Sequence, residues 1–249
     1  MAFRKANHTR VGLLGQMDEN TLPIMICLAG FGDQPDMFDP LFSTALSDKV
    51  RLLPLALPGF GAPPLAETTL EALADFVATK AKQEKASYLI GHSVASIIAS
   101  MAADRLDGQI IRHFSLEGNL TDKDAYFSGK AAQFASAGDF MDYCKIRNSN
   151  ADPDDAILMR YWQRVVTSDA SALWQLGLSA FRYSQKAVPG DLLQRASPVT
   201  YLYNPDNLHS DSLAYLNAFA LDRAELAGAS HWPTLDQPEA VSAVITERL

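Results

Sequence analysis

Residues 86–106 read "ASYLIGHSVASIIASMAADRL". Their first six residues form a short apolar run typical of a buried strand, and the residues from Val94 onward have the apolar spacing of a helix. Ser93 therefore lies where a strand ends and a helix begins. A serine in this position is either an ordinary helix N-cap or a nucleophile held above the edge of a sheet.

The residues around this serine are small. A nucleophile between a strand and a helix must occupy a very tight turn, which needs small residues two positions before and two positions after it. Gly91 and Ala95 stand at those positions, so the pattern is G-x-S-x-A. In such a turn the N-terminus of the following helix points at the site. The pattern is short and taken alone it leaves both interpretations of Ser93 open.

Strands and helices alternate on both sides of this stretch. Nearly continuous apolar runs are typical of parallel strands that are covered on both faces. We predict such strands at 11–16, 23–30, 50–57, 86–91, 109–116, 198–204 and 223–230, with helical patterns between them, among them a capped helix over 68–85. The predicted fold is a doubly wound, mostly parallel α/β sheet.

One long segment interrupts the alternation. Residues 119–195 have helical patterns only, and the alternation returns after them. We therefore predict a core made of 1–118 and 196–249, with an all-helical insertion of 119–195 before the last two strands.

Composition narrows the class of protein. The 249 residues have a net charge of −8, which argues against nucleic acid as a partner. Two cysteines make no disulfide framework, and we find neither a signal peptide nor an apolar run long enough to span a membrane. The expectation is a cytoplasmic protein, and a homo-oligomer is possible.

A histidine follows the last apolar run. His231 stands in "GASHWP" at 228–233, after the strand predicted at 223–230. A histidine there lies on the same sheet edge as Ser93, and ligands of open α/β sheets bind along that edge. His231 is thus the candidate base, the alternative being a surface histidine before a helix. His92 is expected to pack near the turn.

A glycine loop after an earlier strand is a candidate oxyanion site. The stretch "CLAGFGD" at 27–33 follows an apolar run and carries two glycines. Its Phe31 N–H, together with the N–H of Val94, would bind the negative oxygen of a tetrahedral intermediate. The alternative is an ordinary glycine turn.

Together these stretches resemble the α/β-hydrolase fold family. The resemblance covers the whole chain, in the family's order, through "LAGFG" at 28–32, "LALPGFG" at 55–61, "GHSVAS" at 91–96 and "GASHWP" at 228–233. It implies that 119–195 is the cap, or lid. Three residues depart from the family's usual pattern: Ala29 stands for a histidine, Ala56 for an aspartate and Ala95 for a glycine.

The resemblance leaves two candidates for the acid that orients the histidine. The usual position, after the strand that follows the cap, is Asn207, and Asp206 is one residue early. Some members, including certain haloalkane dehalogenases, place the acid at the tip of the strand before the cap, which here ends with Glu117. We favour Glu117, with Asp206 as the alternative. If Glu117 has no catalytic role, it is either exposed at the rim or fixes the entry to the cap.

The function expected from these residues is hydrolysis by a serine. Ser93, His231 and Glu117 would cleave the carboxylic ester of a small to medium, partly apolar molecule through an acyl-enzyme, without metal or organic cofactor. Thioester, lactone, amide or C–C cleavage would use the same residues. A receptor-like binding protein, a lyase or an acyltransferase on the same fold are the alternatives.

Overall fold

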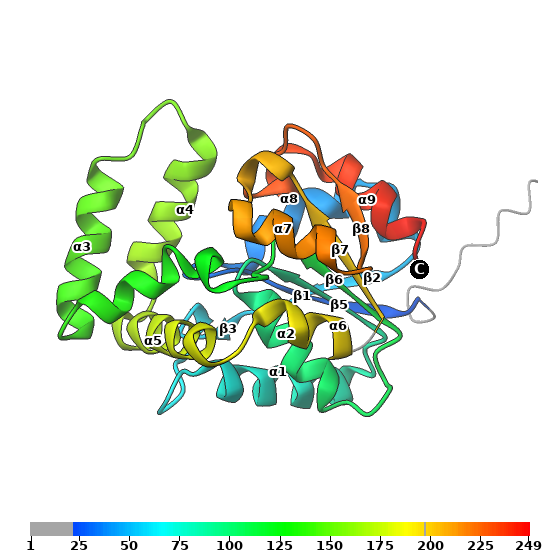
Figure 1. Ribbon diagram of the computed structural model, residues 1–249, viewed down its shortest axis with the longest axis horizontal. Coiled ribbons are helices and arrows are strands. Elements are labelled where there is room, and N and C mark those ends of the chain that lie inside the picture. Colours follow the sequence, from blue (N-terminus) through cyan, green and yellow to red (C-terminus); the bar gives the residue numbers. More distant parts are fainter. Residues whose placement is uncertain (1–21, 197) are drawn as a thin grey trace, which may run out of the picture.

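The computed structural model describes residues 22–196 and 198–249 (Figure 1). Its central sheet has six strands in the order β2-β1-β5-β6-β7-β8, and all of the neighbouring pairs are parallel. The strands are β1 (Ile24–Leu28), β2 (Arg51–Pro54), β5 (Tyr88–His92), β6 (Arg112–Leu116), β7 (Val199–Tyr203) and β8 (Asp222–Glu225). The predicted fold class is confirmed, while the strand predicted at 11–16 lies outside the described residues.

Side chains of the inner strands alternate between two apolar cores. In β1, Met25 and Cys27 point into one cluster and Ile26 and Leu28 into the other, and all four are fully buried. Successive residues of a strand face opposite sides of the sheet, so a strand without polar positions must be covered on both faces.

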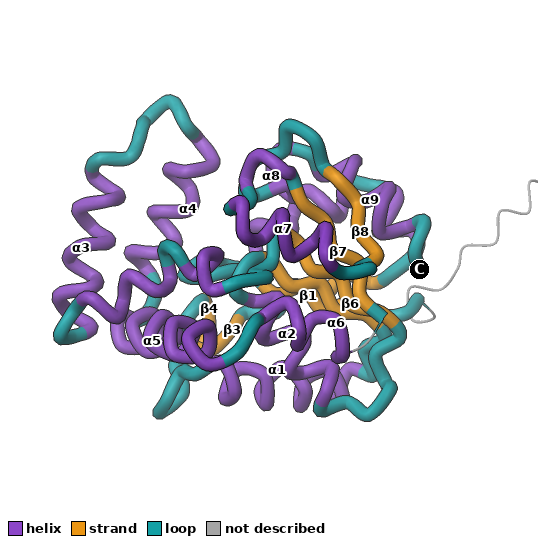
Figure 2. Tube along the Cα trace, in the orientation of Figure 1, coloured by secondary structure: helices purple, strands orange, loops and turns teal. Residues whose placement is uncertain are grey.

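Helices supply that cover. One face packs against α1 (Leu70–Glu84), α2 (Ala95–Asp104) and α6 (Pro189–Ala196). The other face packs against two 3₁₀ segments, η2 (Pro35–Ser43) and η3 (Ala45–Asp48), and against α8 (Pro233–Asp236) and α9 (Pro238–Thr246). Figure 2 shows the sheet between these two layers. Helix α7 (Ser210–Ala218) connects β7 to β8, and the short strands β3 (Leu57–Pro58) and β4 (Gly61–Ala62) form a separate pair.

Two segments differ from the sequence prediction in ways that bear on the site. The helical pattern after β1 forms 3₁₀ turns, with Pro40 inside the first of them, because proline cannot donate the backbone bond of an α-helix. The last strand ends at Glu225, before the predicted 230, because the chain then turns: Ala229 N–H donates to Leu226 O and Gly228 has φ +75°. This turn begins the loop that carries His231.

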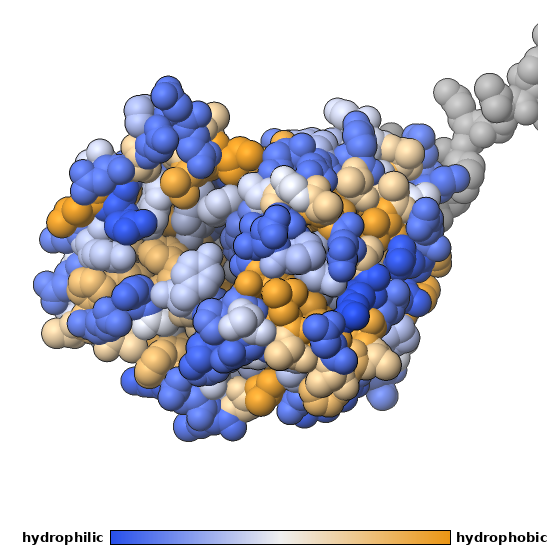
Figure 3. All heavy atoms as spheres, turned by 45° about the horizontal axis from the view of Figure 1, so that its top comes forward, coloured by the Kyte–Doolittle hydropathy of each residue, from blue (hydrophilic) through white to orange (hydrophobic). Residues whose placement is uncertain are grey.

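The insertion between β6 and β7 is entirely helical. It contains η4 (Asp122–Ala125), η5 (Ser128–Gln133), α3 (Ala137–Ser149), α4 (Ala156–Thr167) and α5 (Ala170–Lys186), followed by α6. Helices α3, α4 and α5 stand to one side of the sheet in Figure 1, whereas α6 packs against α2 and β7. In Figure 3 hydrophilic residues cover the outer tip of the α3–α4 arm, and apolar residues are seen where the arm meets the rest of the molecule. The division into core and cap at 119 and 195 stays a prediction.

Candidate active site

Ser93 occupies a strained turn between β5 and α2. Its φ is +53°, a left-handed conformation that L-residues with a side chain rarely adopt. The Ser93 N–H donates to Leu116 O at 2.9 Å, which ties the turn to the end of the neighbouring strand β6. Backbone strain of this kind persists only where the surroundings fix it, and it is found mostly at functional sites.

Two glycines allow the turn to be this tight. A Cβ added to Gly91 would lie 2.6 Å from Ala95 O, which is backbone and cannot move aside. A Cβ added to Gly30 would lie 2.7 Å from Nδ1 of His92 and 3.2 Å from the Ser93 Cβ. The loop after β1 therefore passes directly over the serine turn, as the sequence predicts for a loop that supplies an oxyanion donor.

His231 lies beside a buried carboxylate. Its Nδ1 is 3.5 Å from Oε2 of Glu117, whose side chain is only 1% exposed. Glu117 follows β6 with a φ of +49°, and its N–H donates to Leu202 O at 2.8 Å. The Asn204 N–H donates to the other carboxylate oxygen, Oε1, at 2.6 Å. Glu117 is thus buried, and not exposed at the rim.

The structure does not bring the alternative acid, Asp206, to the histidine. Asp206 is exposed, and within residues 22–196 and 198–249 no hydrogen bond or ion pair joins its carboxylate to His231. Asn204 and Asn207, from the same segment, instead donate their side-chain amides to Ala229 O at 2.8 and 3.2 Å. The tip of β7 therefore supports both the buried carboxylate and the histidine loop.

His92 packs beneath the histidine loop. Its Nε2–H donates to the backbone oxygen of His231 at 2.6 Å, and the two rings are 4.8 Å apart. Burial, followed by the neighbouring His231, lowers the pKa of His92 well below its usual value. A neutral His92 anchors the loop and places no second positive charge next to His231.

The two predicted oxyanion donors lie at the same end of the sheet. Phe31 and Ser93 line one cavity, and Val94 follows Ser93 directly at the N-terminus of α2. In the described part of the chain, neither the Phe31 N–H nor the Val94 N–H is engaged by a backbone or side-chain acceptor. Free N–H groups at a helix N-terminus suit a negatively charged oxygen.

Helix α4 of the insertion holds the Phe31 loop. Arg160 donates to Oδ1 of the buried Asp33 at 2.9 Å, and the Tyr161 hydroxyl donates to Phe31 O at 3.0 Å. A second pair joins Arg164 to Asp36 at 2.9 Å. Burial raises the pKa of Asp33, and Arg160 opposes that shift. The insertion is therefore fastened to the loop that carries a predicted oxyanion donor.

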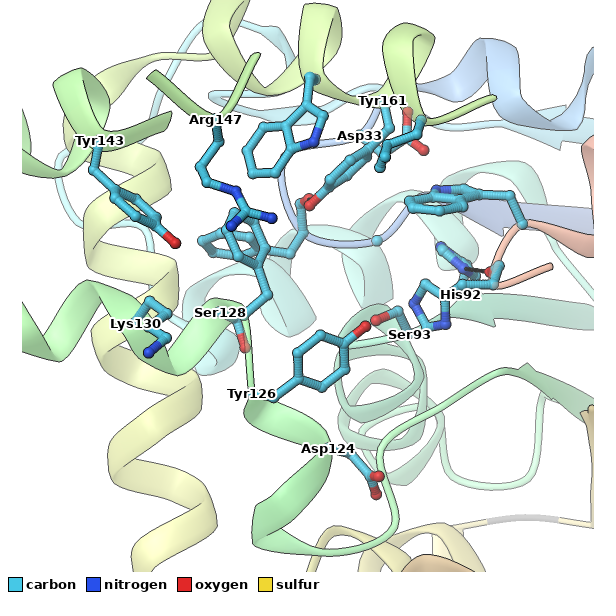
Figure 4. Close-up of a pocket in the computed structure, with 17 residues that line it drawn as sticks. Asp33, His92, Ser93, Asp124, Tyr126, Ser128, Lys130, Tyr143, Arg147 and Tyr161 are labelled. Carbon is cyan, nitrogen blue, oxygen red and sulfur yellow. Dashed lines mark hydrogen bonds between the residues drawn. The ribbon is translucent and has the colours of Figure 1, made fainter. Parts of the chain in front are cut away.

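A cavity of about 290 Å³ joins these groups. Figure 4 shows Ser93 with the hydroxyl of Tyr126 directed toward it, and His92 close by. Aromatic side chains supply most of the wall, namely Phe31, Tyr126, Phe127, Tyr143, Tyr161, Trp162 and Trp232. The described residues contain no group of three His, Cys, Asp or Glu side chains arranged to hold a metal ion, and no helix among them is long and apolar enough to cross a membrane.

Comparison with known proteins places this geometry in a family. Residues 25–244 match the family described as "Alpha/beta hydrolase family". The chain belongs to the α/β hydrolase family. Comparison with curated protein sequences finds no match.

Solved structures share the fold of this α/β hydrolase. An esterase from Thermogutta terrifontis is 18% identical, with a TM-score of 0.67 and coverage of 91% of this chain and 88% of that one. An enol-lactonase from Burkholderia xenovorans LB400 is 16% identical, with a TM-score of 0.67 and coverage of 91% and 90%. The N-acyl homoserine lactonase AidH is 15% identical, with a TM-score of 0.66 and coverage of 91% and 88%. At these identities the likeness shows the fold alone.

Sequence reasoning missed several residues around the site of this hydrolase. Asn204 is one of them, since it donates to Glu117 through its backbone N–H and to the histidine loop through its side-chain amide. The contacts from Arg160 and Tyr161 to the Phe31 loop join residues far apart in the chain, so a single sequence carries no local signal for them. The asparagines at 204 and 207, which flank a Pro-Asp pair, are the one local signal that could have indicated a supporting role for this loop.

Proposed function

We propose that this α/β hydrolase cleaves the carboxylic ester, or a related acyl bond, of a small to medium, partly apolar substrate through an acyl-enzyme on Ser93. The observation that supports this most directly is the His231–Glu117 pair. A buried carboxylate 3.5 Å from Nδ1 favours the tautomer that carries its proton on that nitrogen. The lone pair of Nε2 is then free to accept the proton of a serine hydroxyl.

The proposed hydrolysis needs no reactant other than the ester and water. Ser93 Oγ attacks the acyl carbon while its proton passes to Nε2 of His231. The tetrahedral intermediate collapses, the C–O bond to the alcohol breaks, and His231 returns the proton to the leaving oxygen. Water then attacks the acyl-serine, again with His231 as base. The bond between the acyl carbon and Ser93 Oγ breaks, His231 returns the proton to Oγ, and the acid is released.

Backbone groups would stabilise the charge that develops during these steps. The Phe31 and Val94 N–H groups point to an oxyanion site, because hydrogen bonds that are fixed in place before reaction cost no reorganisation. Losing one such donor typically costs about 10²–10³ in kcat. The fastening of the Phe31 loop by Arg160 and Tyr161 would keep the first of these donors in position.

Size and lining of the cavity support the substrate class. Aromatic walls and a volume of about 290 Å³ fit a small to medium molecule with apolar parts. Ester-type bonds also agree with the names of structures that share the fold, an esterase, an N-acyl homoserine lactonase and an enol-lactonase.

A fluorophosphonate probe tests the nucleophile. Incubation of the folded protein with the probe, followed by intact-mass and peptide analysis, should show one adduct on Ser93, with none in Ser93→Ala. A panel of p-nitrophenyl esters with increasing acyl length should be hydrolysed with a preference for lengths that fill the cavity. The Ser100→Ala variant is a matched control, because Ser100 is a buried serine of α2 outside the cavity.

The outcomes separate the competing functions. Labelling together with ester turnover supports the hydrolase. Labelling with transfer to an added alcohol, but without release of free acid, would show an acyltransferase. Folded protein that is neither labelled nor active would contradict the proposal and favour a binding protein or a lyase on the same fold.

A further inference from the structure

The cavity has a positively charged end. Lys130 of η5 and Arg147 of α3 both line it, together with Tyr143 and Ser128. Figure 4 shows these four side chains grouped on the side of the cavity away from Ser93 and His92. Two cationic side chains thus face one cavity in a chain whose net charge is −8.

No carboxylate of the described residues neutralises this pair. Neither Lys130 nor Arg147 takes part in an ion pair within 22–196 and 198–249; Arg147 instead lies over the Trp162 ring, 5.6 Å from its centre. The two acids that line the same cavity are already engaged. Asp33 pairs with Arg160. Asp124 accepts hydrogen bonds from the Leu120 N–H and from the Ser212 hydroxyl of α7, and Figure 4 shows it beyond Tyr126, away from Arg147.

Apolar side chains line the same cavity as the cations and the serine. Phe127, Leu158 and Trp162 line the cavity, and Phe127 and Trp162 are in edge-to-face contact at 5.1 Å. A ligand that fills the space would therefore have an apolar middle and an anionic end. An arginine and a lysine on the same side of a cavity suit a carboxylate, since the guanidinium offers paired donors and the ammonium a point charge.

The orientation of the ligand follows from the histidine. His231 returns its proton to the leaving oxygen in the proposed reaction, so the alcohol part lies on the His231 side. The His231 ring is 4.8 Å from that of His92, which is drawn on the opposite side of Ser93 from Arg147 and Lys130 in Figure 4. The acyl part consequently extends toward the cations.

We propose that the substrate is an ester whose acyl chain ends in a carboxylate, a half-ester of a dicarboxylic acid, and that Arg147 and Lys130 bind this carboxylate. The proposal rests on the proposed hydrolase function and adds the charge and orientation of its substrate. Because Arg147 is exposed and Lys130 half-buried, the attraction is partly screened and weakens as salt is added.

Paired substrates test the proposal. Mono-p-nitrophenyl esters of adipic, pimelic and suberic acid are compared with the hexanoate, heptanoate and octanoate, in which a methyl group replaces the carboxylate. For the chain length that fits, we expect the wild-type kcat/KM for the acid ester to exceed that for the neutral ester roughly tenfold or more. This ratio should fall about tenfold in the double variant that carries Arg147→Gln and Lys130→Met. In the wild-type protein it should also fall as the ionic strength is raised.

A surface lysine of the same helix controls for overall charge. Lys145 lies in α3, pairs with Asp142 and does not line the cavity, so Lys145→Met should keep the wild-type ratio. A ratio near one at every length in the wild-type protein, or a ratio that survives the double substitution, would overturn the proposal. So would a preference for a carboxylate on the alcohol part of the ester.

A binding measurement keeps the test independent of turnover. Calorimetric titration of the Ser93→Ala protein with monomethyl pimelate and with methyl heptanoate should give at least tenfold tighter binding of the half-ester. This difference should be lost when Arg147→Gln and Lys130→Met are added. Equal affinities for the two ligands would refute a carboxylate-binding site at Arg147 and Lys130. Failure of the hydrolase proposal shows separately, as the absence of probe labelling and of turnover for every ester.

Discussion

The backbone N–H of Asn204 donates a 2.6 Å hydrogen bond to Oε1 of Glu117, and so joins the tips of two neighbouring strands. In the family's usual pattern the acid follows the strand that precedes Asn204, whereas we favoured Glu117 from the sequence. Here that strand supplies a hydrogen-bond donor to Glu117, the proposed acid, which follows the neighbouring strand β6. Oε2 of the same carboxylate is left to face Nδ1 of His231 at 3.5 Å. Each oxygen of Glu117 therefore has one partner of its own.

Replacing Glu117 with Gln should remove the orienting acid with little change in shape. The Gln carbonyl can still accept from Asn204, but the amide would then present a donor to Nδ1 and favour the wrong histidine tautomer. We expect kcat to fall on the order of 10³–10⁴. Steady-state kinetics on the best p-nitrophenyl ester measure this effect.

Asp206→Asn is the matched control for that substitution. Asp206 is exposed, and its only hydrogen bond in the described part of the chain is the one from its N–H to Asn204 Oδ1. We expect kcat within about twofold of wild type, since surface substitutions away from a site change little. A large loss in Asp206→Asn beside a nearly active Glu117→Gln would reverse the assignment.

The strain at Ser93 should be measurable as stability. At φ +53° an alanine is strained, whereas a glycine is not. We therefore expect the free energy of unfolding of Ser93→Gly to be about 1 kcal/mol higher than that of Ser93→Ala. Both variants lack the nucleophile, and urea denaturation compares them directly. Ala99→Gly, within α2, should change stability in the opposite direction by about 1 kcal/mol. Equal stability of the two Ser93 variants would show that the turn is not strained.

The features that could be predicted from the sequence depend on residues that are close together in the chain. Apolar runs gave β1, β5 and β6, and the small residues around Ser93 gave the tight turn, because both follow from a few neighbouring side chains. The strand β8 was predicted too long, since its last apolar residues belong to the turn at Gly228.

The surroundings of the site could not be predicted in this way. The support that Asn204 gives to Glu117, and the hold of Arg160 on Asp33, depend on which loops meet after the sheet and the insertion have formed. Such contacts join residues 87 and 127 positions apart. The spacing of apolar residues shows which face of a helix or strand is buried, but it does not show which other helix, strand or loop packs against that face.

Replacing Arg160 should leave the buried Asp33 carboxylate without its ion-pair partner. The Asp33 side chain is 1% exposed and Arg160 donates to both of its oxygens, at 2.9 and 3.2 Å. We expect Arg160→Met to lower the free energy of unfolding by about 2 kcal/mol at pH 7, because the carboxylate then lacks its partner. Arg160→Met should also lower kcat, since the Phe31 loop loses one of its fastenings.

The pH dependence distinguishes this effect from lost packing. Burial already raises the pKa of Asp33, and without Arg160 that pKa rises further, so the carboxyl is protonated more readily as the pH falls. The loss of stability in Arg160→Met should therefore shrink between pH 7 and pH 5. In an Asp33→Asn background the same substitution should cost much less at both pH values. A cost that is independent of pH and of Asp33 would refute the ion-pair explanation.

His113 should make the protein less stable in acid. Burial lowers the pKa of this side chain to about 3, whereas in the unfolded chain it is about 6.5. Between these values the unfolded chain binds a proton that the folded protein does not, so stability rises with pH through this range. From pH 7 to pH 5 we expect His113 to lower the free energy of unfolding by about 2 kcal/mol.

Urea denaturation at the two pH values measures this loss of stability. His113→Gln should reduce the loss by about the same amount, leaving the part due to His92. His209→Gln, at a half-exposed position, should leave the loss unchanged, and an equal loss in His113→Gln and wild type would contradict the prediction.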